Sequence, residues 1–167
     1  IDKKDLGVHS EMACDTMLDL WEAGIITNRR KTFMPYRCIF TFAMGTQRLY
    51  DWIDDNPGVE FHPVDFVNDP HIIGKNDNMV SINACLQVDL TGQICSESLG
   101  YKQYTHPGGQ LDFVDGAFKS KGGVSIIATP STARPRSGDG TVISKIAPQI
   151  TPGGIITTHR SCADYVI

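Results

Sequence analysis

The sequence contains no hydrophobic run that approaches the roughly 18 residues that a helix needs to span a bilayer. It also has no excess of basic residues, since 15 Lys and Arg stand against 19 Asp and Glu for a formal net charge of −4. Nucleic-acid affinity comes largely from neutralised phosphates, so this balance argues against a nucleic-acid surface. We therefore expect neither a membrane nor a nucleic acid among the partners.

Several catalytic and metal-binding signatures are also missing. The sequence has no G-x-x-x-x-G-K-[ST] phosphate loop and no G-x-S-x-G nucleophile elbow. His62 and His71, with Asp65 and Asp69 between them, form the one local cluster that contains two histidines. Neither an H-x-x-x-H helix nor a C-x-x-C knuckle accompanies them, so we predict no metal site.

The cysteines lack the regular spacing of a zinc site or a disulfide scaffold. Their number is odd, and no two of them stand in a C-x-x-C arrangement. Free thiols in a reducing compartment are therefore expected, and with them a cytoplasmic protein. The five cysteines are Cys14, Cys38, Cys85, Cys95 and Cys162.

The two ends of the sequence predict a fragment of a longer chain. The opening is charged, carries no initiator methionine and does not resemble a signal peptide. The last three residues, Tyr165 to Ile167, are typical of the middle of a strand. The length of 167 residues suits one domain and is tight for two. With 41% hydrophobic and 20% charged residues, the composition is that of a globular protein.

Short apolar runs that alternate with amphipathic segments predict an α/β domain with a covered sheet. We expect Asp15 to cap the first helix, Thr91-Gly92 to turn a hairpin, and Leu111, Val114 and Phe118 to share one helical face. The predicted helices cover 15–23, 47–54 and 110–118. The predicted strands cover 38–43, 59–65, 79–82, 85–90, 93–98, 124–129, 141–146, 155–158 and 164–167.

Two polar side chains are candidates for chemistry. Glu11 lies just before the first predicted helix, where the helix dipole stabilises a carboxylate; the alternative is an acid that only caps or is solvated. Asn83 lies inside an apolar strand and must find partners for its amide. It either positions a substrate carboxylate or carbonyl or is a satisfied core or turn asparagine.

The pair Gly108-Gly109 opens the third predicted helix and exposes backbone amides without side-chain cover. Such amides can hold an anion or a developing oxyanion. A tight turn that needs a positive φ is the alternative explanation for the pair.

These residues fall within six ordered strings that resemble the C-terminal half of the acetyl-CoA hydrolase/transferase family, and most of all its 4-hydroxybutyrate CoA-transferases. The resemblance covers essentially the whole chain. The strings are DLGVHSEMACDTMLDLWEAGIITN, FAMGTQRLYDWIDDNP, INACLQVDLTGQICSES, GGQLDFVDGAF, IATPSTA and ITPGGIITTHRSCADYVI.

The resemblance implies a CoA-transferase-like (NagB/RpiA-type) α/β fold, with a largely parallel, mixed central sheet flanked by helices. Residues 1–167 would be the C-terminal half of a two-domain enzyme. Glu11 matches the family's catalytic nucleophile, which forms a glutamyl-CoA thioester in a ping-pong exchange. Asn83, Gly108 and Gly109 match the family's oxyanion and CoA-binding positions.

The same resemblance implies partners and alternatives. Acyl-CoA and a short-chain carboxylate (4-hydroxybutyrate, butyrate or acetate) would be substrates, with no tightly bound cofactor. The N-terminal half would complete the enzyme, which is expected to be a homodimer. An acyl-CoA hydrolase is the first alternative, and a non-catalytic CoA-binding or assembly domain is the second.

Two segments depart from the family pattern. His106-Pro107 replaces small residues before the glycine pair, which puts the acyl-chain preference in doubt. The segment 134–139 is longer than the usual turn and is interpreted as an insertion.

Overall fold

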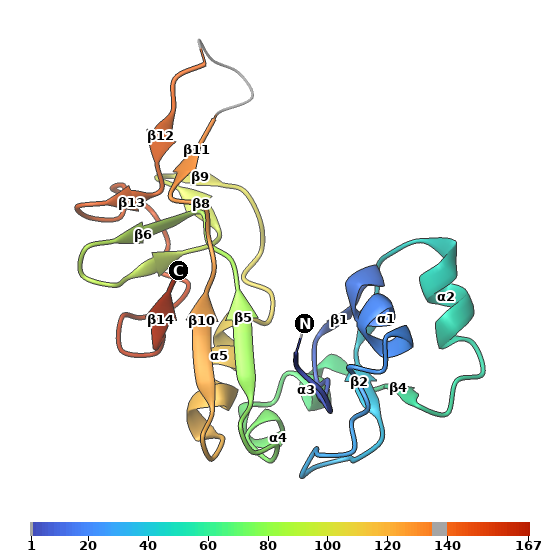
Figure 1. Ribbon diagram of the computed structural model, residues 1–167. Helices are drawn as coiled ribbons and strands as arrows, with labels where there is room; N and C mark the ends of the chain where they lie inside the picture. Colours follow the sequence, from blue (N-terminus) through green and yellow to red (C-terminus); the bar gives the residue numbers. More distant parts are fainter. Residues whose placement is uncertain (1, 135–139) are drawn as a thin grey trace. The chain divides into compact units, whose positions relative to one another are not determined.

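The computed structural model describes residues 2–134 and 140–167, and it combines helices with parallel and antiparallel strand pairs (Figure 1). Most of the insertion predicted at 134–139 lies outside the described residues. Although the length is tight for two domains, the chain divides into two compact units. The first comprises Ile1–Met79 and Lys119–Gly122, and the second Val80–Phe118 and Gly123–Ile167. None of the described helices is both long and apolar enough to cross a membrane.

The first unit contains two pairs of short parallel strands, in which β1 pairs with β3 and β2 pairs with β4. Parallel strands need a crossover connection, and the helices α1 and α2 supply these connections. The elements are β1 (Met12–Ala13), α1 (Asp15–Glu22), β2 (Cys38–Phe40), β3 (Phe42–Ala43), α2 (Gln47–Ile53), β4 (Val59–Phe61), α3 (Val64–Val67) and α4 (Pro70–Ile73).

The core of the first unit lies between these strands and helices. Trp21 of α1 and Trp52 of α2 meet edge to face, with their ring centroids 5.5 Å apart. This geometry is favoured for aromatic pairs and joins the two helices over the buried strands. The buried residues of this core are Val8, Ala13, Ile26, Cys38 and Phe40.

Asp15 was predicted to cap its own helix, but it does not. It is the first residue of α1, and Cys14 occupies the N-cap position. The Asp15 carboxylate instead accepts hydrogen bonds from Thr46, at 3.1 Å from the backbone N–H and 2.7 Å from the hydroxyl. Thr46 is the N-cap residue of α2, so one carboxylate ties the beginnings of both helices together.

Two predicted strands of the first unit are shorter than expected. The segment 38–43 is interrupted at Thr41, which separates β2 from β3. The segment 59–65 ends at Phe61, and Pro63 is the N-cap of α3. Proline has no N–H to donate to a strand ladder, but it fits the start of a helix.

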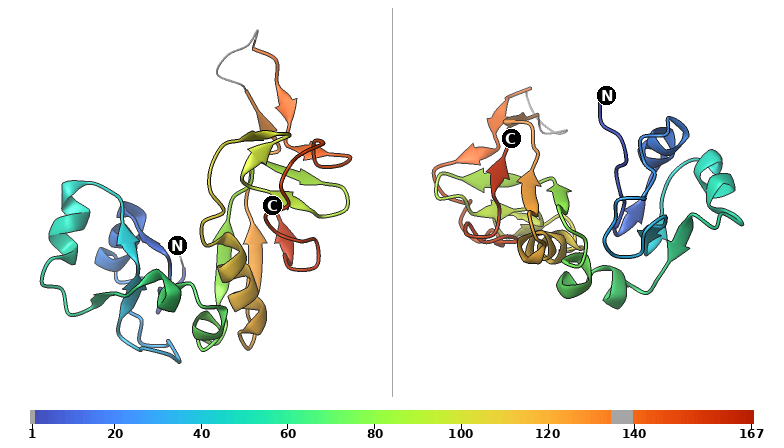
Figure 2. Two further views of the ribbon diagram at one scale, coloured as in Figure 1. Left: turned by 180° about the vertical axis from the view of Figure 1, so that it is seen from behind. Right: turned by 60° about the horizontal axis from the view of Figure 1, so that its bottom comes forward.

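The second unit is built on the parallel sheet β14-β10-β5 and the mixed sheet β13-β6-β7. Views from the front and from behind show α5 on one face of β5 and β10 (Figures 1 and 2). The elements are β5 (Val80–Asn83), β6 (Gln87–Asp89), β7 (Ile94–Cys95), β8 (Ser98–Leu99), β9 (Lys102–Gln103), α5 (Gln110–Lys119), β10 (Val124–Ile127), β11 (Thr132–Ala133), β12 (Ile143–Ser144), β13 (Ile146–Ala147) and β14 (Tyr165–Val166).

The predicted hairpin is confirmed, because β6 and β7 pair antiparallel around Gly92, whose φ is +86°. The predicted strand at 155–158 is wrong. That segment makes only a single bridge between Thr158 and Ile94.

The helix predicted at 110–118 is confirmed as α5, but of the three residues expected to share one face only Val114 is buried. Leu111 is 49% exposed and Phe118 is 75% exposed. The buried stripe has the helical spacing 110, 113, 114 and 117. This stripe was missed because its first member, Gln110, is polar.

A short segment from far along the sequence completes the first unit. The Ser120 hydroxyl donates to the carbonyl of Asn76 at 2.6 Å and accepts from the N–H of Met79 at 3.1 Å. The N–H of Asn78 donates to the carbonyl of Lys121 at 2.8 Å. Residues 119–122 therefore belong to the first unit, although they comprise the last residue of α5 and the three residues that follow it.

Candidate functional site

Glu11 lies on a bend directly before β1 and is half-buried. Its backbone carbonyl accepts hydrogen bonds from Thr41 at 2.9 Å and Phe42 at 3.1 Å, which fixes the bend against the break between β2 and β3. The side chain is held separately, because Nδ2 of Asn68 donates to Oε2 of Glu11 at 2.9 Å. Both the backbone and the carboxylate of Glu11 are thus fixed within the first unit.

Asn68 was not among the predicted site residues. It is the C-cap residue of α3, it is buried, and its N–H donates to the carbonyl of Val64 at 2.9 Å. Among the described residues, no donor reaches its Oδ1. In the sequence it belongs to the string Asn68-Asp69-Pro70, which is typical of a turn. Nothing in this string indicates that the Asn68 side chain is buried, so the residue was missed from the sequence.

A neutral histidine lies two residues before Glu11. His9 is buried, and its Nε2 is 2.8 Å from the carbonyl oxygen of Val67. Burial lowers the pKa of His9 to about 4, although the hydrogen bond to Val67 opposes this change. At neutral pH, His9 therefore brings no positive charge to this part of the first unit.

Asn83 is the last residue of β5 and is half-buried. Its Nδ2 donates to the hydroxyl of Ser81 at 2.9 Å, and its carbonyl accepts from the N–H of Ala128 at 2.8 Å. One of its two amide hydrogens is therefore engaged within its own strand.

The glycine pair lies where it was expected, directly before α5. Gly108 has a φ of +55° and is exposed, whereas Gly109 is buried. The carbonyl of Gly109 accepts the first helical hydrogen bond of α5, from Phe113 at 3.0 Å. His106 and Pro107, which precede the pair, are exposed.

Glu11 belongs to the first unit, whereas Asn83, Gly108 and Gly109 belong to the second. The structure therefore describes the surroundings of the nucleophile candidate in the first unit and those of the oxyanion candidates in the second. Their joint action is part of the function proposed below.

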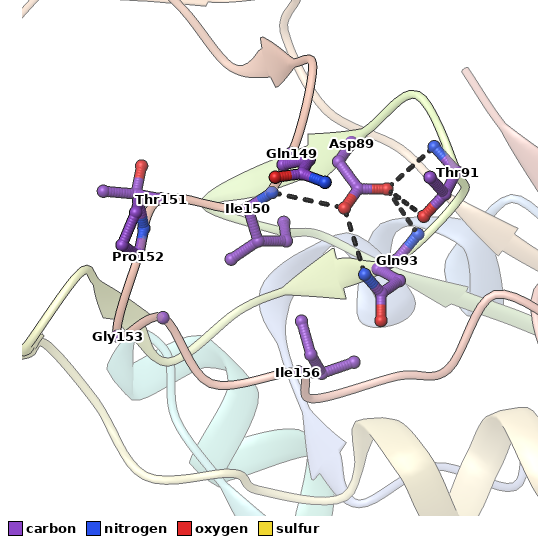
Figure 3. A pocket seen from close by; sticks show the side chains of 10 residues that line it. Asp89, Thr91, Gln93, Gln149, Ile150, Thr151, Pro152, Gly153 and Ile156 are labelled. Carbon is purple, nitrogen blue, oxygen red and sulfur yellow. Dashed lines mark hydrogen bonds between the residues drawn. The ribbon is translucent and has the colours of Figure 1, made fainter.

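A polar pocket of about 230 Å³ lies beside the β6–β7 hairpin (Figure 3). Its central group is the buried carboxylate of Asp89, which accepts hydrogen bonds from the N–H and hydroxyl of Thr91, the N–H and amide of Gln93, and the N–H of Ile150. Burial opposes ionisation of Asp89, but these donors hold its pKa well below the usual range. A carboxylate with five donors is saturated, so we interpret the pocket as structural.

The histidine cluster at 62–71 does not form a metal centre. Nε2 of His62 lies 3.0 Å from the Glu60 carboxylate, and the Asp69 carboxylate accepts from the backbone N–H of His71 at 2.8 Å. Within residues 2–134 and 140–167, no group of three or more His, Cys, Asp or Glu side chains could hold a metal ion. All five cysteines are free thiols.

Comparison with known proteins identifies the family. The sequence model of the acetyl-CoA hydrolase/transferase C-terminal domain matches residues 45–167, a range that begins after Glu11. The 4-hydroxybutyrate coenzyme A transferase of Clostridium kluyveri is 54% identical over 99% of this chain and 37% of its own length. The succinyl-CoA:cyclohexane-1-carboxylate CoA transferase of Geobacter metallireducens is 52% identical over the same shares.

Among solved structures, RipA from Yersinia pestis superposes with a TM-score of 0.88 at 52% identity, covering 99% of this chain and 36% of RipA. The chain thus spans little more than a third of the length of these relatives. The family resemblance and the α/β fold are both confirmed. The chain belongs to the acetyl-CoA hydrolase/transferase family, and its residues 45–167 match the model of the C-terminal domain.

Proposed function

We propose that the full-length protein is a CoA-transferase that moves coenzyme A from an acyl-CoA to a short-chain carboxylate. The observation that carries the proposal is the fixed carboxylate of Glu11, held at one oxygen by Asn68 in a chain so similar to named CoA-transferases. Residues 1–167 supply the C-terminal half. An N-terminal half completes the enzyme, which works as a cytoplasmic homodimer.

The exchange runs through a covalent enzyme intermediate. A carboxylate oxygen of Glu11 attacks the thioester carbonyl of the acyl-CoA, which forms an acyl-glutamyl anhydride and expels CoA thiolate. The thiolate then attacks the glutamyl carbonyl, which forms a glutamyl-CoA thioester and releases the first carboxylate. A second carboxylate reverses these two steps and leaves as the new acyl-CoA, and Glu11 is regenerated.

The environment of Glu11 suits a nucleophile. Asn68 engages Oε2, so Oε1 is the oxygen that we assign to attack. The donor is a neutral amide, which orients the carboxylate without the strong stabilisation that a cationic partner would give to its charge. A carboxylate held in this way loses little rotational freedom when it attacks, which lowers the entropic part of the barrier.

Each tetrahedral intermediate carries an oxyanion that needs hydrogen-bond donors. The backbone amides at Gly108-Gly109 are the main candidates, because the positive φ of Gly108 turns the chain just before α5. Asn83 is a weaker candidate, because one of its amide hydrogens already binds Ser81. The site must also exclude water, since the anhydride would otherwise hydrolyse.

The acceptor carboxylate differs among relatives of similar identity. The Clostridium kluyveri relative is named for 4-hydroxybutyrate, and the Geobacter metallireducens relative for cyclohexane-1-carboxylate. We propose 4-hydroxybutyrate, butyrate or acetate as the acceptor of this protein. A panel of carboxylates assayed with one acyl-CoA donor ranks them by kcat/KM.

An acyl-CoA hydrolase is the second candidate, because the family name includes hydrolysis. The two activities differ in the acceptor, which is water in one and a carboxylate in the other. A glutamate at position 11 favours transfer, since its reach suits a glutamyl-CoA thioester. The test follows new acyl-CoA and free thiol in parallel, and thiol release without new acyl-CoA would establish the hydrolase.

The catalytic role of Glu11 is tested by Glu11→Gln in the full-length protein. We expect the exchange to be abolished while the protein stays folded, because an amide cannot form the anhydride. Hydroxylamine added to the wild-type enzyme with acyl-CoA should modify the peptide that contains Glu11. Glu22→Gln is the matched control, since Glu22 is an exposed acid of α1 that pairs with Arg48. Turnover retained by Glu11→Gln would refute the assignment.

A further inference from the structure

We propose that Gln110 and Glu97 are positioning residues that fix the Gly108-Gly109 turn. They bind two consecutive threonines, Thr157 and Thr158, so that both ends of the segment 104–110 are tethered to one place. The inference rests on the function proposed above, in which the amides of this turn face the oxyanion. All of these residues lie in the second unit.

The first tether holds the end of the segment that enters α5. Nε2 of Gln110 donates to the hydroxyl oxygen of Thr158 at 2.9 Å. Gln110 is 8% exposed and Thr158 is 0% exposed, so the bond is shielded from water. Gln110 also begins the buried stripe of α5, where an apolar side chain would be usual. A polar residue at this interior position is explained by its bond to Thr158.

The second tether holds the other end of the segment. The backbone carbonyl of Glu97 accepts hydrogen bonds from the N–H of Tyr104 at 2.7 Å and of Thr105 at 3.1 Å. The carboxylate of Glu97, which is 7% exposed, accepts from the Thr157 hydroxyl at 2.8 Å. The same hydroxyl accepts from the N–H of Ser96 at 2.9 Å. A buried carboxylate is costly without partners, so the bond from Thr157 stabilises Glu97 in this position.

The two threonines are themselves anchored in the core. The N–H groups of Thr157 and Thr158 donate to the carbonyl of Ile94 at 2.9 and 3.2 Å, and the N–H of Ile94 donates back to Thr158 at 3.1 Å. Ile94 belongs to β7 and is fully buried. The segment 104–110 connects β9 to α5 (Figure 1). Both of its ends are thus linked, through the two threonines, to β7.

The two tethers restrict the backbone of the Gly108-Gly109 turn, which is otherwise free to move. Glycine has more backbone freedom than other residues, so a Gly-Gly turn does not hold its amides in one direction by itself. Oxyanion donors work because they are already oriented when the charge develops, and displacement by about 1 Å can cost about 100-fold in rate. Neither Gln110 nor Glu97 needs to touch the substrate to have this effect.

The test uses Thr158→Val in the full-length protein, because valine keeps the shape of threonine and removes its hydroxyl. We expect faster amide hydrogen exchange in the peptide that contains residues 104–112. We also expect kcat to fall by about tenfold to 100-fold, with the KM for acyl-CoA within about threefold of wild type. Thr158→Ser, which restores the hydroxyl, should recover both the slow exchange and kcat.

Gln110→Met removes the donor from the other side of the bond and is the second variant if Thr158→Val does not fold. If both changes act through this one bond, the double variant should be no slower than either single variant. Ser125→Ala is the matched control, because it removes a buried hydroxyl of β10 that donates to the carbonyl of Cys162 at 2.9 Å. It should leave kcat and the exchange of 104–112 unchanged.

The outcomes separate this inference from the proposed function. Wild-type exchange of 104–112 in Thr158→Val would overturn the tether. An equal loss of kcat in Ser125→Ala, or no recovery in Thr158→Ser, would also overturn it, because the effect would then be general destabilisation. Faster exchange in Thr158→Val, in an enzyme whose wild type transfers no CoA, would contradict the proposed function and still support the tether.

Discussion

Nδ2 of Asn68 lies 2.9 Å from Oε2 of Glu11, so a buried, uncharged side chain fixes the carboxylate that we assign as the nucleophile. The bond joins the end of α3 to the bend before β1, two places that are far apart in the sequence. The geometry of the nucleophile therefore depends on a residue that stands more than fifty positions away along the chain.

Replacing Asn68 should slow the transfer reaction without unfolding the protein. In Asn68→Ala the Glu11 carboxylate loses its donor and gains rotational freedom, so we expect kcat to fall by about tenfold to 100-fold. Steady-state kinetics of the full-length enzyme measures the change. Asn56→Ala is the control, because Asn56 donates to the carbonyl of Trp52 in the same unit. Equal kinetics for Asn68→Ala and wild type would show that Glu11 needs no such donor.

Removing the Asp15 carboxylate should destabilise the first unit. Asp15→Ala leaves both the N–H and the hydroxyl of Thr46 without this acceptor, and a hydrogen bond of this kind contributes about 0.5–1.5 kcal/mol. Thermal unfolding of the full-length protein should show a lower midpoint. Asp19→Asn is the comparison within α1, since it removes only an exposed ion pair with Arg48, which contributes little. A loss as large in Asp19→Asn as in Asp15→Ala would contradict a stabilising role for the hydrogen bonds between Asp15 and Thr46.

Acid should weaken the fold through His9. Its pKa is about 4 in the folded protein against an ordinary value of 6.5, so the unfolded chain binds more protons between these values. The free energy of unfolding therefore falls as the pH drops through this window, by about 2 kcal/mol at pH 5 for this one group. We expect the melting temperature to fall less between pH 7.5 and 5 in His9→Gln than in wild type. An identical fall in both proteins would exclude His9 as the cause.

The Asp89 carboxylate should stabilise the second unit without taking part in the chemistry. In Asp89→Asn one acceptor oxygen becomes a donor that faces the donors of Gln93 or Ile150, which costs about 1–3 kcal/mol. We expect a lower melting temperature and, below that temperature, a kcat near that of wild type. Asp51→Asn, in which an exposed acid changes in the same way, is the control. A large loss of kcat in a folded Asp89→Asn protein would show that the pocket takes part in the reaction.

The sequence predicted the elements that depend on local signals. The helix at 110–118 and the turn at Thr91-Gly92 were found because helical spacing and turn glycines act over a few residues. The position of Gly108-Gly109 before α5 followed from the same signals. Strand lengths were less predictable, because the break at Thr41 depends on hydrogen bonds to Glu11, which lies far away in the sequence.

The polar interior could not be predicted from the sequence. Gln110 is buried with a hydrogen bond to Thr158, and Asn68 is buried with a hydrogen bond to Glu11. No local sequence pattern indicates either partner. Asp15 shows a similar effect, since its type and position indicated a helix cap, whereas its carboxylate binds the distant residue Thr46. Long-range hydrogen bonds between polar side chains are the part of this fold that the sequence does not show.

The segment 119–122 limits how the protein can be dissected. Ser120 and Lys121 complete the hydrogen bonding of residues 76–79, so a fragment that stops after Met79 lacks part of its own unit. Protease cleavage between Met79 and Val80 would cut the backbone but leave these bonds in place. The first unit can therefore not be prepared intact by a single truncation, and a separate first unit would need residues 119–122 grafted to its end.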